Sequence, residues 1–408
     1  MKLNPLKEMP LIVMVLLAML NGSQLPGQQP LTIFILAGQS NTVGHARAHT
    51  IATLFPSSDS RDQQLRQMVF KGNRGVSLES FEAQLELGRK IDRLTGGISN
   101  DKLKKMPSGP EKTAIEDQVK QLKEARQSYK EMVNAACVVS DRVYINSIAD
   151  RNKKSGKLGI GYGADQTKIG PEYGFGLSIA ERVKGPILLI KTSWGGKSLN
   201  YNFRPPSAGT YQLSEKEESE GKAEEIRKNA SLNYRMMNQT IHETLANLKD
   251  HHPDYDPNIG HRIAGFVWFQ GYNDQFSPEF RDNYKNNMIS FIKDIRKEYN
   301  QPSMPFVIGV LGTGVTAEKV AQNQVSVGQR EAANAPEFKD NVEAVESYIH
   351  YSHYSHQIFK KGWPEHYHEW DTVGSDRPYH YLGSGAFFVR LGDAFADSMV
   401  DLMGKQPK

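Results

Sequence analysis

Four short apolar runs, each bounded by turn residues, organise the chain. They are Thr32–Ala37, Ile187–Lys191, Ile263–Trp268 and Pro305–Val310. Runs of this length are typical of buried parallel strands. Helical patterns follow them, because apolar residues recur on one face from Phe280 to Ile295 and from Phe387 to Met403. This alternation predicts an α/β domain built on a parallel sheet.

Residues 51–157 interrupt the alternation. One helical stripe lies between Leu78 and Leu94 and another between Ile115 and Met132, with a link rich in Gly, Lys and Pro between them. We interpret the segment as a helical insertion after the first strand. It would either pack on the domain as a decoration or serve in oligomerisation or in shaping a cleft.

The composition excludes several classes of protein. The 408 residues include 50 Lys and Arg against 46 Asp and Glu, and this net charge of +4 is too small to favour nucleic acid as a partner. Cys137 is the single cysteine, which excludes an internal disulfide and any CxxC metal or redox site. An ordinary soluble enzyme or binding protein remains.

The N-terminus has the pattern of a secretory signal peptide. Lys2 and Lys7 precede the apolar run Met9–Leu20, and small polar residues follow at 21–23. The run is shorter than the roughly 20 residues that span a bilayer. We therefore predict a signal peptide over residues 1–27, an exported protein and no stable membrane insertion once the signal is removed. An uncleaved anchor or a buried helix is the alternative.

The turns after the predicted strands carry candidate chemistry. They are Gly38-Gln39-Ser40-Asn41, residues 192–198 and residues 270–274, and a polar segment, residues 375–380, precedes the last helix. Ligands of parallel α/β sheets bind beyond the carboxyl ends of the strands. Ser40 there could be a nucleophile with His380 as its base, oriented by Asp376 four residues earlier. Taken alone, Ser40 could instead cap a helix.

Together these turns carry a family resemblance. Gly38-Gln39-Ser40-Asn41, Trp194-Gly195-Gly196-x-Ser198-Leu199 and Trp268-Phe269-Gln270-Gly271, followed late by His380, resemble the SGNH-hydrolase superfamily. The similarity is closest to sialate O-acetylesterase-like and family 6 carbohydrate acetylesterases, and it covers residues 31–50, 158–200, 230–310 and 372–402. It implies a three-layer α/β/α, flavodoxin-like hydrolase domain over residues 31–408 with the helical insertion at about 51–157.

The resemblance also implies an activity and a role for each matched residue. The protein would be a serine esterase that removes acyl groups, acetyl first among them, from an acylated carbohydrate without a cofactor or a metal. Ser40 would be the nucleophile and His380 the general base. The oxyanion hole would combine the Ser40 amide, the Gly196 amide and the Gln270 side chain. The predicted substrate-binding residues are Asn41, Trp194 and Tyr272.

Two positions depart from the family pattern. Tyr272 stands where the family commonly has Glu, and Arg377 stands where it has the Asp three residues before the histidine. The orienting group therefore stays open between Asp376, Asp274 and a backbone carbonyl. The departures also motivate an alternative function, that of a non-catalytic carbohydrate-binding relative. A further alternative is a scaffold protein that uses the helical insertion. We interpret the histidine-rich stretch 350–370 as an aromatic loop beside the cleft rather than a metal site.

Overall fold

The centre of the molecule is a seven-stranded sheet in the order β4-β3-β6-β1-β7-β8-β9, as a computed structural model describes it for residues 29–406 except 73 and 314. All neighbouring strands are parallel except β3 and β4, which pair antiparallel. The strands are β1 (Leu31–Gly38), β3 (Val143–Ala149), β4 (Asn152–Lys157), β6 (Ile187–Ser193), β7 (His261–Phe269), β8 (Phe306–Val310) and β9 (Val342–Glu346). A small second sheet pairs β2 (Ala46–Arg47) with β5 (Lys168–Ile169).

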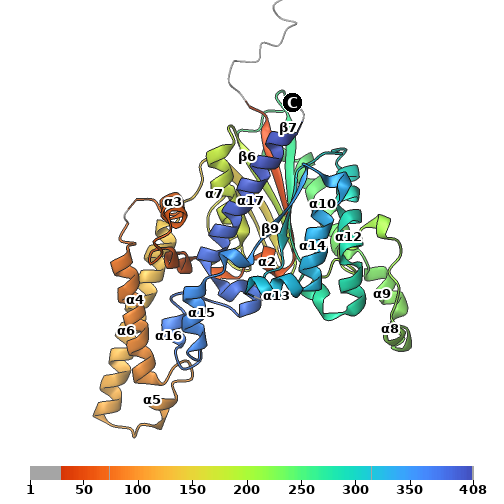
Figure 1. Cartoon of the computed structure of the whole chain (residues 1–408). Coiled ribbons are helices and arrows are strands. Elements are labelled where there is room, and N and C mark those ends of the chain that lie inside the picture. The colour runs from red at the N-terminus through yellow and green to blue at the C-terminus, as the bar shows by residue number, and fades with distance from the viewer. Residues whose placement is uncertain (1–28, 73, 314, 407–408) are drawn as a thin grey trace, which may run out of the picture.

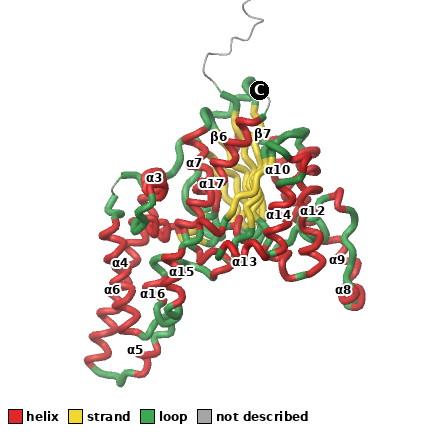
Figure 2. The backbone as a smooth tube through the Cα atoms, viewed as in Figure 1, coloured by secondary structure: helices red, strands yellow, loops and turns green. Residues whose placement is uncertain are grey.

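Helices cover both faces of the sheet, which gives three layers (Figures 1 and 2). Successive side chains of β1 show this, because Phe34 and Leu36 belong to one apolar cluster and Ile33 and Ile35 to the other. The first face is covered by α3 (Ser60–Val69), α7 (Pro171–Arg182) and α17 (Gly385–Lys405). The second is covered by α10 (Leu232–Ala246), α12 (Pro278–Glu298) and α14 (Gln324–Ala333). The predicted α/β class is confirmed.

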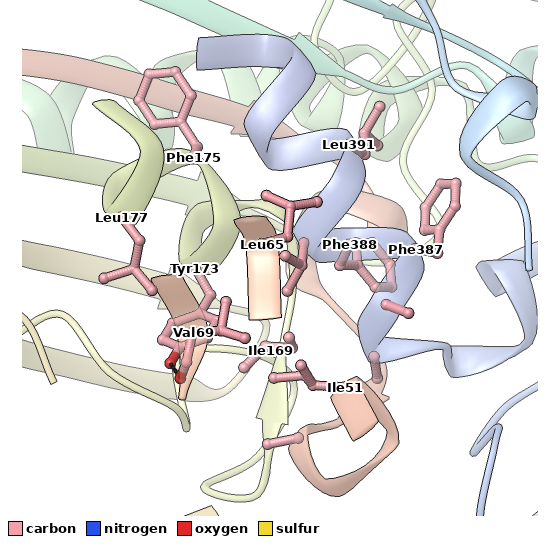
Figure 3. Close-up of a cluster of buried hydrophobic side chains, with 14 of the residues drawn as sticks. Ile51, Leu65, Val69, Ile169, Tyr173, Phe175, Leu177, Phe387, Phe388 and Leu391 are labelled. Atoms are coloured by element: carbon pink, nitrogen blue, oxygen red, sulfur yellow. Dashed lines mark hydrogen bonds between the residues drawn. The ribbon is translucent and has the colours of Figure 1, made fainter. Parts of the chain in front are cut away.

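The tightest helix pair is α7 with α17. Figure 3 shows Phe175 and Tyr173 of α7 in the same buried cluster as Phe388 of α17. A Cβ on Gly392 would lie 2.4 Å from the Phe175 amide nitrogen, so this position of α17 has room for no larger residue. The apolar face predicted for residues 387–403 is therefore the face that packs on α7.

The remaining helices are short or lie outside the three layers. They are α2 (Ser40–Val43), α4 (Leu78–Thr95), α5 (Asp101–Lys105), α6 (Pro110–Ala136), α8 (Glu215–Ser219), α9 (Ala223–Asn229), α11 (Leu248–His251), α13 (Ala317–Gln322), α15 (His353–Lys360) and α16 (Tyr367–Trp370). The 3-10 helices are η1 (Ala48–Leu54), η2 (Pro206–Ala208), η3 (Tyr272–Phe276), η4 (Pro336–Phe338), η5 (Tyr348–His350) and η6 (Pro378–Gly383).

The four predicted strands are β1, β6, β7 and β8, but β3, β4 and β9 are additional. Residues 143–157, which we assigned to the helical insertion, form β3 and β4 of the central sheet. The sequence of β4, NKKSGK, contains no apolar residue because this strand lies at the edge of the sheet and alternates between half-buried and exposed positions. Before β3, the helical part of the segment ends at Ala136, and α4 and α6 form a hairpin that projects from the domain (Figure 1).

Within the described residues, no helix is both long and apolar enough to cross a membrane. The predicted signal peptide, residues 1–27, lies outside them.

A buried ion pair lies directly beneath α2. Lys191 of β6 and Glu172 of α7 are both fully buried, with Nζ 2.7 Å from Oε2. Nζ also donates to the carbonyl oxygens of Val43, at 2.9 Å, and Tyr162, at 2.8 Å. Burial raises the pKa of Glu172 and lowers that of Lys191, and each partner opposes the shift of the other. The pair thus joins the centre of the sheet to the C-terminal end of α2.

We expect Lys191→Met to lower the free energy of unfolding by about 3–5 kcal/mol, because it leaves the Glu172 carboxylate buried without its cation. Urea denaturation measures this. Lys157→Met is the matched control, since the Lys157–Asp141 pair is exposed and contributes about 1 kcal/mol or less. An equal, small effect of both substitutions would contradict the role given to Lys191.

Candidate active site

Three of the sequence-predicted turns come together at one edge of the sheet. β1 lies between β6 and β7, and Gly38 at its end is level with Ser193 and Phe269 at theirs. The turns that follow therefore start side by side, near α2 at the lower end of the sheet in Figure 1. This edge is the carboxyl end of the parallel strands, where ligands of such sheets bind.

Gln39 connects the first turn to the third. Its Oε1 accepts hydrogen bonds from the backbone amides of Gly271 and Asn273, both at 3.3 Å, and its Nε2 donates to Asn273 Oδ1 at 3.1 Å. The side chain is fully buried. Gln39 has no role of its own in the sequence prediction, because its hydrogen-bond partners become neighbours only when β1 and β7 pair.

Ser40 is the first residue of α2, a single helical turn. Its carbonyl accepts from the Gly44 amide at 3.0 Å, and the residue is 9% exposed. Within the described residues, neither the Ser40 amide nor the Gly196 amide donates a hydrogen bond. Gly196 has a φ of +70°, which favours glycine, and a Cβ there would meet only open space. Both predicted oxyanion-hole amides are thus unpaired.

Gln270 lies in a different environment from the one expected of an oxyanion-hole donor. Its Nε2 lies 2.9 Å from Lys197 O, 2.5 Å from Asp274 Oδ2 and 3.1 Å from Gln39 Oε1, and the residue is 2% exposed. An amide nitrogen has two protons, and three acceptors already surround this one. Gln270 therefore holds neighbouring turns together and has no free donor for a ligand.

Asn273 has the free donor that Gln270 lacks. Gln39 fixes its amide orientation, since Asn273 Oδ1 accepts the Gln39 Nε2 proton. Within the described residues no acceptor takes the Asn273 Nδ2 protons, and the residue is half-buried. Its position two residues after Gly271 is the sequence signal that marks Asn273 as a residue of this turn. The sequence does not show whether Gln270 or Asn273 has the free side-chain donor, because that depends on the hydrogen bonds.

Asp274, the alternative orienting acid, does not contact His380. The carboxylate is fully buried and accepts from the Leu199 and Asn200 amides at 3.0 Å, in addition to Gln270. Burial raises the pKa of Asp274 to about 6, although the hydrogen bonds from Gln270, Asn200 and Leu199 oppose the rise. Asp274 fixes the turn after β6.

Asp376 is the carboxylate that lies beside His380. Asp376 Oδ2 is 3.3 Å from His380 Nδ1, and Asp376 Oδ1 accepts from the Arg377 amide at 2.7 Å. Arg377, at the departing position of the family pattern, thus supports the carboxylate through its backbone. Burial raises the pKa of Asp376, but the adjacent His380 and His45 rings outweigh burial, and the pKa lies well below its ordinary value.

His380 belongs to η6, whose backbone is strained. Tyr381 and Leu382 have φ values of +53° and +62°, a conformation that costs a non-glycine residue about 1–3 kcal/mol. The buried Tyr381 hydroxyl, 3.0 Å from both the Gly312 amide and Ser347 Oγ, helps to hold this turn. Burial lowers the pKa of His380 below 6.5, with Asp376 opposing and His45 and Lys168 adding to the shift. The imidazole is therefore neutral, as a base must be, over more of the pH range.

A ring contact and a hydrogen bond bring His380 to the first turn. His45, one residue after Gly44, stacks on His380, and Ser375 Oγ donates to the His45 carbonyl at 3.2 Å. Among the described residues, no hydrogen bond joins Ser40 Oγ to His380. Catalytic hydrogen bonds in ligand-free enzymes are often long and tighten only with substrate, so the pair stays a candidate.

His45, Asp376 and His380 also place three possible metal-ligand atoms within 4.8 Å of one another. The two imidazole planes are nearly parallel, at 4°, and their centroids are 4.1 Å apart. A metal ion lies in the plane of each imidazole that binds it, and two stacked planes do not meet at an ion. The stack therefore does not fit a metal site.

The three predicted substrate-binding residues have different positions. Asn41 is 2% and Trp194 8% exposed, and the Trp194 ring packs in the apolar core beside Phe203, so both are buried in the fold. Tyr272 is half-buried and contacts Phe276 and Tyr379 with ring centroids 5.2 and 5.6 Å away. Phe276 is 65% and Tyr379 41% exposed. These three rings form an aromatic surface next to His380.

A family comparison shows to which family the chain belongs. The model of the family described as carbohydrate esterase, sialic acid-specific acetylesterase, matches residues 126–359, more than half of the chain. The chain belongs to this family of carbohydrate esterases. The match begins within α6 and ends within α15, so it does not include Ser40, Asp376 or His380.

A relative and three solved structures are similar to this esterase. A protein of Arabidopsis thaliana named "Probable carbohydrate esterase" is 30% identical over 69 residues, which cover 17% of this chain and about a quarter (26%) of that protein. An Arabidopsis thaliana structure has a TM-score of 0.43 at 17% identity, covering 91% of this chain and 98% of that one. A carbohydrate acetylesterase from Xanthomonas citri has a TM-score of 0.36 at 12% identity, covering 77% and 49%. NanS has a TM-score of 0.37 at 10% identity, covering 78% of each chain.

Substitution of the two acids should give different results. We expect Asp376→Asn to lower kcat by up to about four orders of magnitude with little change in KM, because the histidine loses the anion that orients it. Asp274→Asn should instead lower the melting temperature, because Asp274 binds two backbone amides. Ester hydrolysis and thermal unfolding measured on both variants test this. A near-normal kcat in folded Asp376→Asn would exclude Asp376 as the orienting group.

Proposed function

We propose that this chain is a serine esterase that removes acyl groups, acetyl in the simplest case, from a carbohydrate through an acyl-enzyme at Ser40. The observation that carries the proposal is the position of Ser40. The backbone amide of Ser40 is unpaired within the described residues. Ser40 lies on a turn that Gln39 joins to Asn273, and the segment that follows this turn carries His45, which stacks on His380.

In this mechanism Ser40 Oγ attacks the acyl carbon and passes its proton to His380 Nε2. The Ser40 amide, the Gly196 amide and Asn273 Nδ2 would donate to the oxygen that becomes negative, with Asn273 in the place first given to Gln270. The acyl–oxygen bond to the sugar then breaks, and His380 returns the proton to the sugar oxygen. Water, deprotonated by His380, releases the acid and restores Ser40.

Two surfaces beside His380 support a carbohydrate as the substrate. The first is the exposed aromatic surface of Tyr272, Phe276 and Tyr379, since flat rings can stack on sugar faces. The second is a cavity of about 210 Å³ that adjoins Asp376 and is lined by Trp363, Tyr367 and other residues of the stretch 359–377, together with Arg47. This cavity supports the expectation that part of the aromatic segment borders the candidate active site.

A fluorophosphonate probe and a panel of acetylated glycans test the function. We expect the probe to form one adduct, at Ser40 by mass spectrometry, and the protein to release acetate from at least one glycan. Ser40→Ala should abolish both and remain folded, while Ser58→Ala, at an exposed serine, should change neither. A folded protein that takes no probe would favour the non-catalytic binding relative. Labelling without acetate release from any glycan would contradict the carbohydrate substrate.

We also propose that the protein is exported. The support is the sequence pattern of Lys2, Lys7 and the apolar run Met9–Leu20. The protein recovered from the exported fraction of an expressing cell should begin between about residues 22 and 30, which N-terminal sequencing determines. Recovery only of the full-length chain from the membrane fraction would indicate an uncleaved anchor instead.

A further inference from the structure

His45 lies face to face with the candidate base. The His45 and His380 rings stack with centroids 4.1 Å apart and an interplanar angle of 4°. Both side chains are mostly buried, at 18% and 13% exposure. The contact joins the segment just after the nucleophile turn to the loop before the last helix. Neither the sequence analysis nor the family comparison gives His45 a role.

The two rings share one carboxylate oxygen. Asp376 Oδ2 lies 3.3 Å from His45 Nδ1 and 3.3 Å from His380 Nδ1, whereas Oδ1 accepts from the Arg377 amide. A carboxylate oxygen has two lone pairs and can accept from both rings. His380 Nδ1 is buried and has no hydrogen-bond partner among the described residues, so Asp376 acts on it as a neighbouring charge. That charge favours a proton on Nδ1, which leaves Nε2 as the basic nitrogen.

Two sets of contacts fix the backbone that follows His45. Ser375 Oγ donates to the His45 carbonyl at 3.2 Å and accepts from the Arg47 amide at 3.0 Å. Ala46 and Arg47 form β2, which pairs with β5. The His45 ring is thus presented to His380 from a rigid segment, and the stack is a built contact.

We propose that His45 is a positioning residue of this esterase, which supports the face of the His380 ring and shares the Asp376 carboxylate with it. The proposal rests on the proposed function. One carboxylate compensates one imidazolium, and a second positive charge would be uncompensated in a largely buried site. The adjacent His45 ring therefore disfavours the charged form of His380.

The other charged groups around His380 agree with this assignment. Asp376 is the anion that faces the ring, and His45 and Lys168 of β5 are the cations whose charge opposes its protonation. Tyr379 contacts its edge, and the Arg377 guanidinium lies over Trp363, 4.3 Å from the ring centroid. Of the two groups that oppose protonation of His380, Lys168 pairs with Asp165 at 3.3 Å, whereas His45 stacks on the His380 ring.

Two substitutions separate the parts of the proposed role. His45→Phe keeps a ring and removes the proton-binding group. His45→Asn keeps an N–H near the position of Nδ1 and removes the ring. In both, the acidic limb of kcat/KM should move to higher pH, because the His45 ring no longer lowers the pKa of His380. Only His45→Asn should also lower the kcat of the high-pH plateau, by about 10- to 100-fold with KM unchanged, because the base is misplaced. His242→Asn, at an exposed histidine of α10, is the control.

NMR titration of labelled histidines in the ligand-free protein gives a readout that needs no activity. The His380 resonance, assigned by its loss in His380→Gln, should titrate at higher pH in both His45 variants than in the wild type. An unmoved His380 titration in both folded variants overturns the inference. If wild-type protein hydrolyses nothing but the titration moves, the coupling stands as described and the proposed function fails.

Discussion

The arrangement of the site depends on one buried cation. Lys191 extends from the middle of β6 with no access to water, and a buried ammonium is tolerated only if oxygen atoms surround it. Those oxygens come from Glu172, Val43 and Tyr162, which lie on three different segments. Since Val43 is the last residue of the helical turn that begins with Ser40, the requirement of Lys191 for an acceptor also fixes this turn to the sheet.

Buried amides in the turns after the strands also require polar partners. Gln39 and Gln270 are buried amides, and each is hydrogen-bonded to a turn that follows another strand. A buried amide without partners would cost about 1–3 kcal/mol, so the turns after β1, β6 and β7 are held in one relative position before any ligand binds. Donors fixed in this way need no rearrangement as charge develops on a substrate oxygen.

The sequence predicted the parts of the fold that have a one-dimensional signal. The apolar runs of β1, β6, β7 and β8 and the apolar faces of α12 and α17 are visible without coordinates. The edge strand β4 has polar residues on both faces, and only its pairing with β3 makes it a strand. The candidate site shows the same limit. Asp376 could be named as a candidate orienting acid from its distance to His380 along the chain. The choice of Asn273 over Gln270 depended on which amide was already saturated.

The α4–α6 hairpin supports the candidate site through ion pairs made by α6. Arg126 and Lys130 of α6 both pair with the buried Asp371, and Arg47 pairs with the same carboxylate at 3.3 Å. Burial raises the pKa of Asp371, but His49 and Lys130 outweigh it and the net pKa is lowered, so the group is an anion that holds these cations together. Arg47 is two residues from His45, and Asp371 is five residues from Asp376. The hairpin therefore supports, through one carboxylate, both segments that meet in the stacked imidazoles, which is a structural reason for an insertion between the first strand and the rest of the sheet.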